Sequence, residues 1–293
     1  MSNFNNIDLS FTGNYSLTKS ISLASKAAFV DGFSDMQYPE LYFAFPLEDS
    51  WKPVCIKVSQ AQNHLSMTIL DNPQDADNEN IVHQVKRILC LDIDGKGFIE
   101  IANKDSIIGQ LHQKQLGLRP VLFKSPYEAT ARAIIGQRLP VKVASSISRR
   151  IAEEFGTCLE AENKKMYSFP SPEQLKNLPP VSGLAERKVN QLRKLGAVAE
   201  EPWFRTENLR NMNRDEAMAR LQKLSGIGPF SAELIMIRGV GDADNFPLNE
   251  KRLHQAMERA YNLEDAPEMD TLEDIADGWK PYRSWAGLLL RNS

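Results

Sequence analysis

The chain has few cysteines, and none of them has a partner close by in the sequence. Only three of its 293 residues are cysteine, namely Cys55, Cys90 and Cys158. They form no CxxC pair and no Cys/His pattern with zinc spacing, and an iron–sulfur cluster would need more clustered thiolates. The sequence therefore predicts reduced cysteines, as is usual in the cytosol, with no metal finger and no iron–sulfur cluster.

Long hydrophobic runs are also missing. No apolar stretch reaches the ~18 residues that a membrane span requires. The N-terminus, MSNFNNIDLSFTGNYSLTK, lacks the basic region followed by an apolar region that marks a secretory signal. We therefore expect no membrane partner and a cytoplasmic location, associated with the nucleoid if the source is bacterial.

The chain carries no large excess of charge of either sign, since its net charge is −3. The charges are unevenly distributed, however. Residues 1–120 carry a net charge of −4, residues 121–240 carry +6 and residues 241–293 carry −5. A basic middle segment suits contact with phosphates, but a solvated helical surface gives the same pattern. Charge alone leaves both interpretations open.

Residues 1–110 mix strand and helix patterns. The segments KPVCIKVSQ and HLSMTIL alternate in part between apolar and polar residues and are rich in β-branched side chains, which predicts strands. After the polar cluster DNPQDADNEN, the segment IVHQVKRILCL repeats apolar residues at helical spacing. The pattern indicates an α+β region. Its histidines, His64 and His83, stand alone and point to no site.

From residue 125 onward the pattern is helical. Helix-start signals occur four times, at Ser125, Pro140, Ser171 and Asn213. The pattern of residues 184–198 predicts a further helix that is basic and amphipathic. Because no strand signal interrupts residues 125–240, we expect a run of short helices joined by short loops.

The segment LSGIGPFSA, residues 224–232, places two glycines between two helical patterns. Glycine permits positive φ and close backbone approach. A hairpin of this kind exposes backbone amides at the start of the next helix, where they can bind a phosphate. A dinucleotide-binding loop is excluded, because that motif needs a preceding strand and a third glycine. An ordinary corner between two helices remains the alternative.

Several blocks, in one order along the chain, carry a resemblance to a known family. They are ARAIIGQ at 131–137 with PVKVA at 140–144, FPSPEQL at 169–175, Gly183-Leu184 with Arg187-Lys188, the hairpin at 224–232, the loop from Asp242 to Pro247, and WKPYRSWA at 279–286. Together they cover residues 125–293. They resemble the helix-hairpin-helix DNA glycosylase superfamily, and most closely its bacterial 3-methyladenine DNA glycosylase II branch.

The resemblance implies a fold and a division into domains. Residues 1–101 would form an α+β domain like the TATA-binding protein, although this region matches more loosely. The remainder would be an all-α helix-hairpin-helix core with a cleft between two helical subdomains. One subdomain would comprise residues 102–125 together with 243–293, and the other would comprise residues 126–242.

The resemblance also implies a way of holding DNA. Gly226, Gly228, Pro229 and Ser231 would hold the DNA backbone at the hairpin. The backbone carbonyls of Gln222, Leu224 and Ile227 would bind a monovalent cation, Na⁺ or K⁺. In relatives with lyase activity a lysine follows the hairpin by two residues, and here that position is Phe230. A monofunctional enzyme without a lyase step is therefore expected.

The catalytic position departs from the family pattern. The family's aspartate lies four residues after the phenylalanine of the FP pair, and counting from Phe246 reaches Glu250. Glutamate keeps the charge but adds one methylene, and a misplacement of ~1 Å can cost ~100-fold in rate. Two alternatives stay open. Glu250 can be a helix-start residue favoured by the helix dipole, and Asp242 or Asp244 can substitute for it.

The base pocket departs from the pattern as well. In the closest branch aromatic side chains line it and stack on electron-poor alkylated purines. The matching positions here are Phe230, Leu234, Lys251 and Arg291, so one aromatic remains of four. Two cations in such a pocket disfavour a positively charged base unless they face phosphates or pair with Glu250.

The wedge that fills the gap left by a flipped base is a leucine in the closest relatives. Counting along the chain places Gln137, Arg138 and Leu139 in this loop, with Arg138 at the wedge position. An arginine can stack on bases and intercalate, so Arg138 can serve in this role.

The resemblance implies a monomeric, monofunctional DNA glycosylase of base excision repair. It would flip a damaged, alkylated base out of duplex DNA and hydrolyse the N-glycosidic bond with Glu250. The alternative is a catalytically weakened or inactive protein of the same fold that binds damaged DNA. A helical interaction protein without DNA binding would leave the basic middle segment and the hairpin unexplained.

Overall fold

The computed structural model of the chain describes residues 6–26, 33–35, 39–72, 76–263 and 267–293. Its N-terminal part contains a five-stranded antiparallel sheet with the strand order β1-β5-β4-β3-β2. The strands are β1 (Asn6–Asp8), β2 (Phe33–Asp35), β3 (Glu40–Pro46), β4 (Pro53–Ala61) and β5 (His64–Asp71). The strands predicted from KPVCIKVSQ and HLSMTIL are thus confirmed as β4 and β5, whose register pairs Val58 with Met67.

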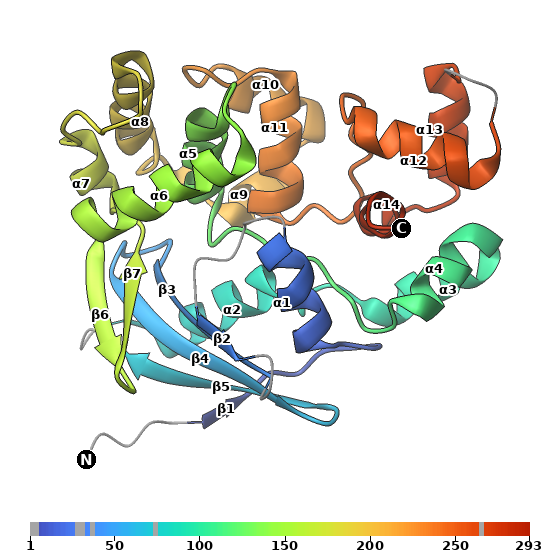
Figure 1. Cartoon of the computed structure of the whole chain (residues 1–293), viewed down its shortest axis with the longest axis horizontal. Coiled ribbons are helices and arrows are strands. Elements are labelled where there is room, and N and C mark those ends of the chain that lie inside the picture. Colours follow the sequence, from blue (N-terminus) through green and yellow to red (C-terminus); the bar gives the residue numbers. More distant parts are fainter. Residues whose placement is uncertain (1–5, 27–32, 36–38, 73–75, 264–266) are drawn as a thin grey trace.

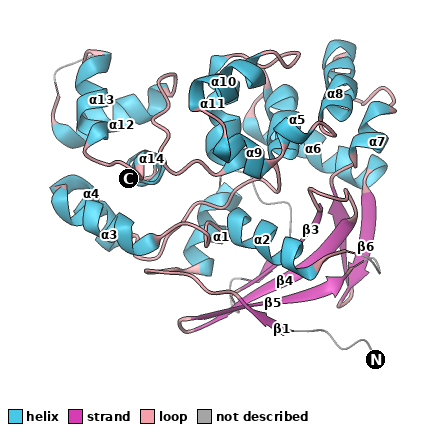
Figure 2. Cartoon of the chain, turned by 180° about the vertical axis from the view of Figure 1, so that it is seen from behind, coloured by secondary structure: helices cyan, strands magenta, loops and turns pink. Residues whose placement is uncertain are grey.

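Two helices cover one face of this sheet, between the strands and the rest of the molecule (Figures 1 and 2). They are α1 (Leu17–Lys26) and α2 (Asn78–Ile88), and α2 confirms the helix predicted from IVHQVKRILCL. Leu41, Phe43 and Phe45 of β3 alternate along the strand and share one apolar core with both helices. This alternation is what fixes the register of the sheet.

The opposite face of the sheet receives a β-hairpin from the middle of the chain. Strands β6 (Thr157–Ala161) and β7 (Lys164–Ser168) pair antiparallel, and Leu159 and Met166 pack on Tyr42 and Ala44 of β3. The expectation that no strand interrupts residues 125–240 is therefore wrong. The hairpin has only five residues per strand, and much of its burial comes from contact with the N-terminal sheet, which is distant in sequence.

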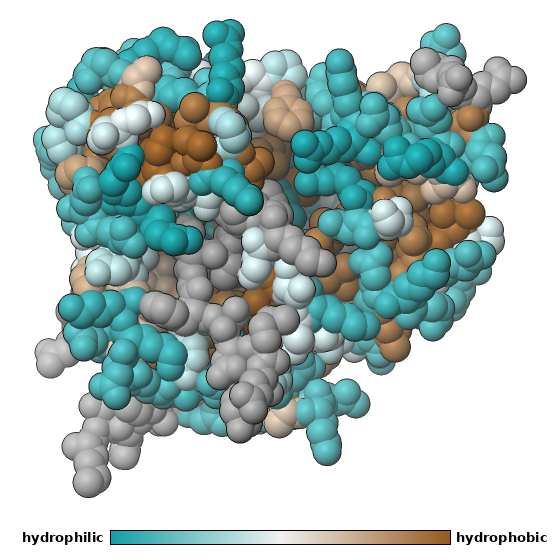
Figure 3. Space-filling view, viewed as in Figure 1, coloured by the Kyte–Doolittle hydropathy of each residue, from teal (hydrophilic) through white to brown (hydrophobic). Residues whose placement is uncertain are grey.

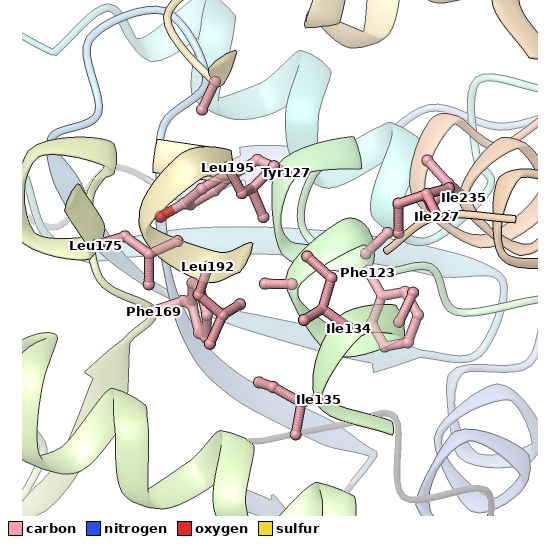
Figure 4. Packing of buried hydrophobic residues seen from close by; sticks show 14 of the residues in the cluster. Phe123, Tyr127, Ile134, Ile135, Phe169, Leu175, Leu192, Leu195, Ile227 and Ile235 are labelled. Atoms are coloured by element: carbon pink, nitrogen blue, oxygen red, sulfur yellow. The ribbon is translucent and has the colours of Figure 1, made fainter. Parts of the chain in front are cut away.

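The middle of the chain is otherwise helical. Its elements are α5 (Pro126–Gly136), α6 (Val141–Phe155), α7 (Pro172–Lys176), α8 (Glu186–Val198), the 3₁₀ turn η1 (Pro202–Phe204), α9 (Thr206–Asn211), α10 (Arg214–Gln222) and α11 (Pro229–Ile235). The predicted starts are confirmed, since Ser125, Ser171 and Asn213 accept hydrogen bonds from first-turn amides and Pro140 precedes α6. Figure 4 shows the shared apolar core, to which Tyr127, Leu192 and Ile235 belong.

Helix α11 does not end as an ordinary α-helix. It continues into a single π turn, η2 (Met236–Val240), which Gly241 terminates at φ +81°. Gly239 lies so close to α5 that an added Cβ would come within 2.7 Å of the Ala129 methyl group. A π turn of this kind contains one residue more than the regular helix and is frequent at functional sites.

The C-terminal helices pack with two helices that follow the N-terminal sheet. Helices α12 (Lys251–Tyr261), α13 (Met269–Asp277) and α14 (Arg283–Arg291) share a core with α3 (Gly95–Lys104) and α4 (Ser106–Lys114). Trp279 is fully buried at the centre. The predicted division into domains stays a prediction. Phe98 of α3 packs with the C-terminal helices, however, whereas the predicted boundary at residue 101 assigns it to the N-terminal domain.

The three largest apolar cores of the described residues are that of the N-terminal sheet with α1 and α2, that of the middle helices, and that of the C-terminal helices with α3 and α4. Two buried arginines connect these cores through hydrogen bonds to backbone carbonyls. The Arg87 guanidinium donates to the carbonyls of Phe123, Lys124 and Gly239. The Arg119 guanidinium donates to those of Thr12, Asn14, Cys90 and Ile93. Burial lowers the pKa of both arginines. Each arginine thus links segments that are distant in sequence.

The architecture is the expected one, an α+β N-terminal part followed by a helix-hairpin-helix core, except that the core contains the β6–β7 hairpin and is otherwise helical. Hydrophilic side chains cover much of the face in Figure 3, and brown apolar atoms gather in patches, one of them on the right between the C-terminal helices and α3–α4. Across the described ranges, no helix combines the length and the apolar character needed to cross a membrane.

Candidate active site and nucleic-acid interface

A cavity of about 80 Å³ lies between the helix that follows the hairpin and the C-terminal helices. Its first wall is one face of α11 and η2, where Phe230, Glu233, Leu234 and Ile237 recur at helical spacing. The remaining residues that line it are Arg238, Pro247, Glu250, Leu253, Ser284, Gly287, Leu288 and Arg291. The lining is thus mainly apolar with a few charged groups, which is the composition usual in ligand pockets.

Glu250 borders this cavity, as a catalytic carboxylate would. It occupies the N-cap position of α12, and no side-chain capping hydrogen bond forms there. Its Oε2 instead lies 3.0 Å from the NH1 of Arg291, and only 18% of its side chain is exposed. The ion pair with Arg291 therefore holds the carboxylate at the wall of the cavity rather than on the helix end.

The loop that carries Glu250 is fixed by the start of α14. Ser284 Oγ accepts from the Asn245 amide at 3.0 Å and lies 2.8 Å from the Asp242 carbonyl oxygen. Arg283 forms an ion pair with Asp244 at 2.8 Å. Arg283 and Ser284 belong to the WKPYRSWA block that carries the family resemblance. In the structure they hold the loop before Glu250 in one conformation.

Asp242 and Asp244, the alternative catalytic residues, lie elsewhere. Asp244 is paired with Arg283, and Asp242 lies 3.5 Å from Arg214. Both line a different cavity, on the side of η2 and α9, and neither borders the cavity of Glu250. Of the three carboxylates considered from the sequence, the structure brings only Glu250 to this cavity.

The structure brings three of the four predicted pocket residues together. Phe230, Leu234 and Arg291 line the cavity, whereas Lys251 is exposed to solvent and does not. Lys251 is the first residue of α12, so its side chain leaves the cavity that the preceding residue borders. Arg291 pairs with Glu250. This pairing is one of the two arrangements, the other being contact with a phosphate, in which a pocket cation does not disfavour a positively charged base.

Sequence reasoning missed two charged residues of the cavity, Glu233 and Arg238. Glu233 is 7% exposed, and its Oε1 accepts a hydrogen bond of 3.0 Å from the Asn249 side-chain amide. Arg238 donates to the Val121 carbonyl, and burial lowers its pKa to about 10. Glu233 and Arg238 lie three and eight residues after Phe230, on the same helical face. This spacing is the sequence signal that would have identified both residues.

The hairpin has the geometry of a backbone clamp. Gly226 adopts φ +90°, and a Cβ there would come within 2.4 Å of the Gln191 side-chain amide. At Gly228, by contrast, an added Cβ would meet no heavy atom within 4 Å and would face open space. Pro229 next to it is exposed and Ser231 is half-buried. The first amides of α11 have no carbonyl partner one turn earlier, so they are available to an anion.

The predicted wedge loop is hydrogen-bonded to the hairpin. The Gln137 side chain donates to the Gly226 carbonyl. The buried Lys188 ammonium donates to the Gln137 carbonyl at 2.6 Å. Leu139 packs against the central core, while Arg138 is exposed at φ +56°. Of the three loop residues, Arg138 is therefore the one whose side chain projects into solvent.

Exposed cations lie close to the hairpin. Lys194 of α8 and Lys223 at the end of α10 line a surface hollow together with Leu224 and Ser225 of the hairpin. The basic character of residues 121–240 is thus concentrated in part beside the exposed backbone of the hairpin. Positive charge beside an exposed hairpin is an arrangement expected where a nucleic-acid phosphate is bound.

The chain is similar in sequence to several proteins, although no protein-family model matches it. The DNA-3-methyladenine glycosylase of Bacillus subtilis is 26% identical over 216 residues, which are 72% of this chain and 71% of that protein. The DNA-3-methyladenine glycosylase 2 of Escherichia coli is 27% identical over 183 residues, which are 61% of each protein.

Solved structures match over almost the whole chain. The 3-methyladenine DNA glycosylase of Archaeoglobus fulgidus has a TM-score of 0.79 and 18% identity, covering 98% of this chain and 97% of that one. The Clostridium acetobutylicum 8-oxoguanine glycosylase/lyase, in complex with double-stranded DNA, has a TM-score of 0.71 and 16% identity, covering 99% and 97%. Likenesses at this identity show a shared fold. Together with the sequence relatives, they show that the chain belongs to the helix-hairpin-helix superfamily of DNA glycosylases.

Proposed function

We propose that this protein is a monofunctional DNA glycosylase that removes an alkylated base from duplex DNA in base excision repair. The observation that carries the proposal is the position of Glu250, a restrained carboxylate on the wall of a mainly apolar cavity. The sequence relatives are named for 3-methyladenine, which supports an alkylated purine as the substrate class. A monomer that acts on damaged double-stranded DNA in the cytoplasm completes the proposal.

The chemistry follows from placing the flipped nucleotide in the cavity. The bond between C1′ and the base nitrogen breaks, its electrons leave with the base, and positive charge develops on the sugar. Glu250 stabilises this charge and accepts a proton from the water whose oxygen bonds to C1′. Phe230 and Leu234 cover the base from α11. Apolar walls exclude water and strengthen the electrostatic effect of the carboxylate.

Arg291 controls how much of the Glu250 charge reaches the sugar. At 3.0 Å it competes with the developing cation for the same carboxylate. With 38% of its side chain exposed, Arg291 can turn towards a DNA phosphate, and the Glu250 carboxylate that it leaves would then face the developing sugar cation. Binding of DNA would then release Glu250 for catalysis at the moment when the sugar is in place.

The DNA backbone is held by the hairpin in this proposal. Gly226, Gly228, Pro229 and Ser231 present the backbone of the loop, and Lys194 and Lys223 add positive charge. Arg138 fills the space that the flipped base leaves in the stack.

A monovalent cation fits the hairpin carbonyls chemically. Gln222 ends α10, so its carbonyl has no intrahelical partner. The Leu224 carbonyl accepts one hydrogen bond, from the Ile227 amide, and keeps a second lone pair. Na⁺ or K⁺ bound to the carbonyls of Gln222, Leu224 and Ile227 would add positive charge beside the phosphate.

The decisive experiment is single-turnover release of free bases from a heavily methylated duplex at low salt. We expect the wild type to release 3- or 7-methylpurines, and Glu250→Gln to lower the rate by about 100- to 1,000-fold, as expected for losing a transition-state charge. Glu250→Asp would act faster than wild type if the extra methylene is a handicap. Glu258→Gln on the same helix is the control and should leave the rate unchanged.

One observation favours a second candidate, a protein that binds damaged DNA without cleaving it. The Arg291 pair partly neutralises Glu250, which is already one methylene longer than the family residue. In that case the duplex would be bound, no base would be released, and Glu250→Gln would bind like the wild type. Release that depends on Glu250 excludes this candidate.

A further inference from the structure

A second carboxylate of the cavity has an unused hydrogen-bonding position. Glu233 is buried, with 7% of its surface exposed, whereas the neighbouring Phe230 is 48% exposed. Its Oε1 accepts from the Asn249 amide, but its Oε2 is buried and accepts no hydrogen bond from any described residue. An unpartnered buried carboxylate oxygen is costly, and native structures rarely leave one without a ligand or water.

The cations of the cavity are engaged with other groups. Arg291 pairs with Glu250, and Arg238 donates to the Val121 carbonyl. Glu233 shares the same helical face as Phe230 and Leu234, which cover the base in the proposed function. Glu233 therefore belongs to the wall against which a flipped base would rest, in buried surroundings where a charge-assisted hydrogen bond is strong.

We propose that Glu233 is a specificity-determining residue, whose Oε2 accepts a hydrogen bond from an N–H group of the flipped base. This inference rests on the proposed function. The carboxylate selects bases that present a donor on the edge facing α11 and that carry positive charge on the ring. Neutral bases without that donor leave Oε2 unpaired and are bound less well, because the site then retains a desolvated acceptor.

The negative charge of Glu233 also bears on the two cations, Lys251 and Arg291, that the sequence analysis placed in the pocket. Lys251 lies outside the cavity, and the charges of Glu233 and Glu250 balance those of Arg238 and Arg291. A cationic alkylated purine can therefore enter without meeting a net positive site. The apparent conflict between an alkylpurine substrate and a basic pocket disappears.

Glu233 also contacts the residue next to Glu250, so a positioning role must be separated from base recognition. The Asn249 side chain donates to Oε1, whereas Oε2 is the atom that contacts the base. Asn249→Ala removes the first contact and leaves the second. If Glu233 only positioned the catalytic loop, Asn249→Ala and Glu233→Gln would slow every substrate by similar factors.

The experiment uses the full chain and two duplexes that differ in one base. The first carries 7-methylguanine, whose ring is cationic and bears N–H donors. The second carries ethenoadenine, which is neutral and has lost the donors of that edge. Single-turnover release and duplex affinity are measured for the wild type, Glu233→Gln and Asn249→Ala, with affinities taken in the Glu250→Gln background. Thermal unfolding confirms that each variant is folded.

We expect Glu233→Gln to weaken release or binding of 7-methylguanine by about 10- to 100-fold, the range for losing a hydrogen bond to a charged group. Ethenoadenine should be unaffected or favoured, so the ratio between the two substrates falls. Equal losses on both duplexes, or a ratio unchanged by Glu233→Gln, overturn the inference while leaving the glycosylase proposal intact. Absence of release from every duplex by the wild type contradicts the glycosylase proposal itself.

Discussion

At the scale of single residues, Phe230 explains why we expect no lyase step. It lines the cavity at the position of the lyase lysine and offers no amine for a Schiff base. Borohydride should therefore trap no covalent adduct between the wild-type protein and abasic DNA. Phe230→Lys should produce a trapped adduct, whereas Leu248→Lys, on an exposed residue that does not line the cavity, should not. An efficient wild-type trap would contradict the monofunctional assignment.

Asp105 illustrates a residue that acts on stability rather than on chemistry. It caps α4 and accepts from the Tyr261 hydroxyl at 2.5 Å and the Trp279 indole at 2.9 Å. Burial raises the pKa of this carboxyl, but the hydrogen bonds outweigh burial and hold the pKa below its usual value. The ionised form thus stabilises the fold above the unfolded pKa of about 3.9 and loses this effect as the pH falls through the folded pKa.

Asp105→Asn should therefore lower the free energy of unfolding by about 2 kcal/mol at neutral pH, allowing for solvent screening. The difference between the variant and the wild type should begin to shrink as the pH falls below about 4, the unfolded pKa, and should vanish below the lower folded pKa, where the wild type also lacks the charge. Urea unfolding of both proteins at neutral and acidic pH measures this. A difference that stays constant with pH would show that the charge is not the stabilising feature.

The candidate site could be predicted from the sequence only in part. Counting from Phe246 led to Glu250, which the structure places on the wall of the cavity. Glu233 was missed because an acidic residue in an apolar helical face carries no motif. The exposure of Lys251 depends on where α12 begins, which a sequence pattern locates only to within a few residues.

At the scale of elements, the hairpin glycines have different roles. Gly226 has positive φ and no room for a Cβ beside Gln191, so Gly226→Ala should lower the free energy of unfolding by about 1–3 kcal/mol. Gly228 faces open space, so Gly228→Ala should change stability by less than about 1 kcal/mol. Gly228→Ala should nevertheless weaken binding to every duplex by a similar factor, because a backbone clamp reads no bases.

Duplex affinities of the folded Gly228→Ala protein, for damaged and undamaged sequences, test this. Gly226→Ala serves as the comparison in which stability and binding fall together. A loss confined to one lesion or one sequence would place Gly228 in base recognition instead of the clamp.

Most elements could be predicted because local signals set them. Caps and prolines fixed the helix starts at Ser125 and Asn213, and alternation fixed β4 and β5. The β6–β7 hairpin could not be recognised in the same way. Its signal is a two-residue turn, Glu162-Asn163, with positive φ at both residues, and its strands gain their burial from the distant β3.

At the scale of the whole molecule, the uneven charge predicts strong salt dependence of DNA binding. Each contacted phosphate contributes a slope of about −0.9 when the logarithm of affinity is plotted against that of salt concentration. Lys223→Gln should reduce the magnitude of this slope by about one contact. Lys165→Gln, on the β6–β7 hairpin at the sheet side of the molecule, should leave it unchanged (Figure 1). Binding that is insensitive to salt would contradict a DNA-binding function.

The three cores also act together in shaping the site. Arg87 holds the carbonyl of Gly239 in η2, and Arg238 of the same turn holds the carbonyl of Val121. The wall of the cavity is thus attached to the segment that connects the N-terminal sheet to the helical core. We therefore expect changes in the N-terminal part to reach the cavity through these bonds.

The π turn at Met236–Val240 suggests how pockets in this fold can diverge. A single extra residue in a helix rotates everything that follows by about 100°, since an α-helix has 3.6 residues per turn. Deleting one residue here would turn Arg238 out of the cavity and bring a neighbour in, with no side chain exchanged. Insertion or deletion of one residue within this turn is thus a route to new base specificity. Such a change alters which side chains line the cavity without any substitution.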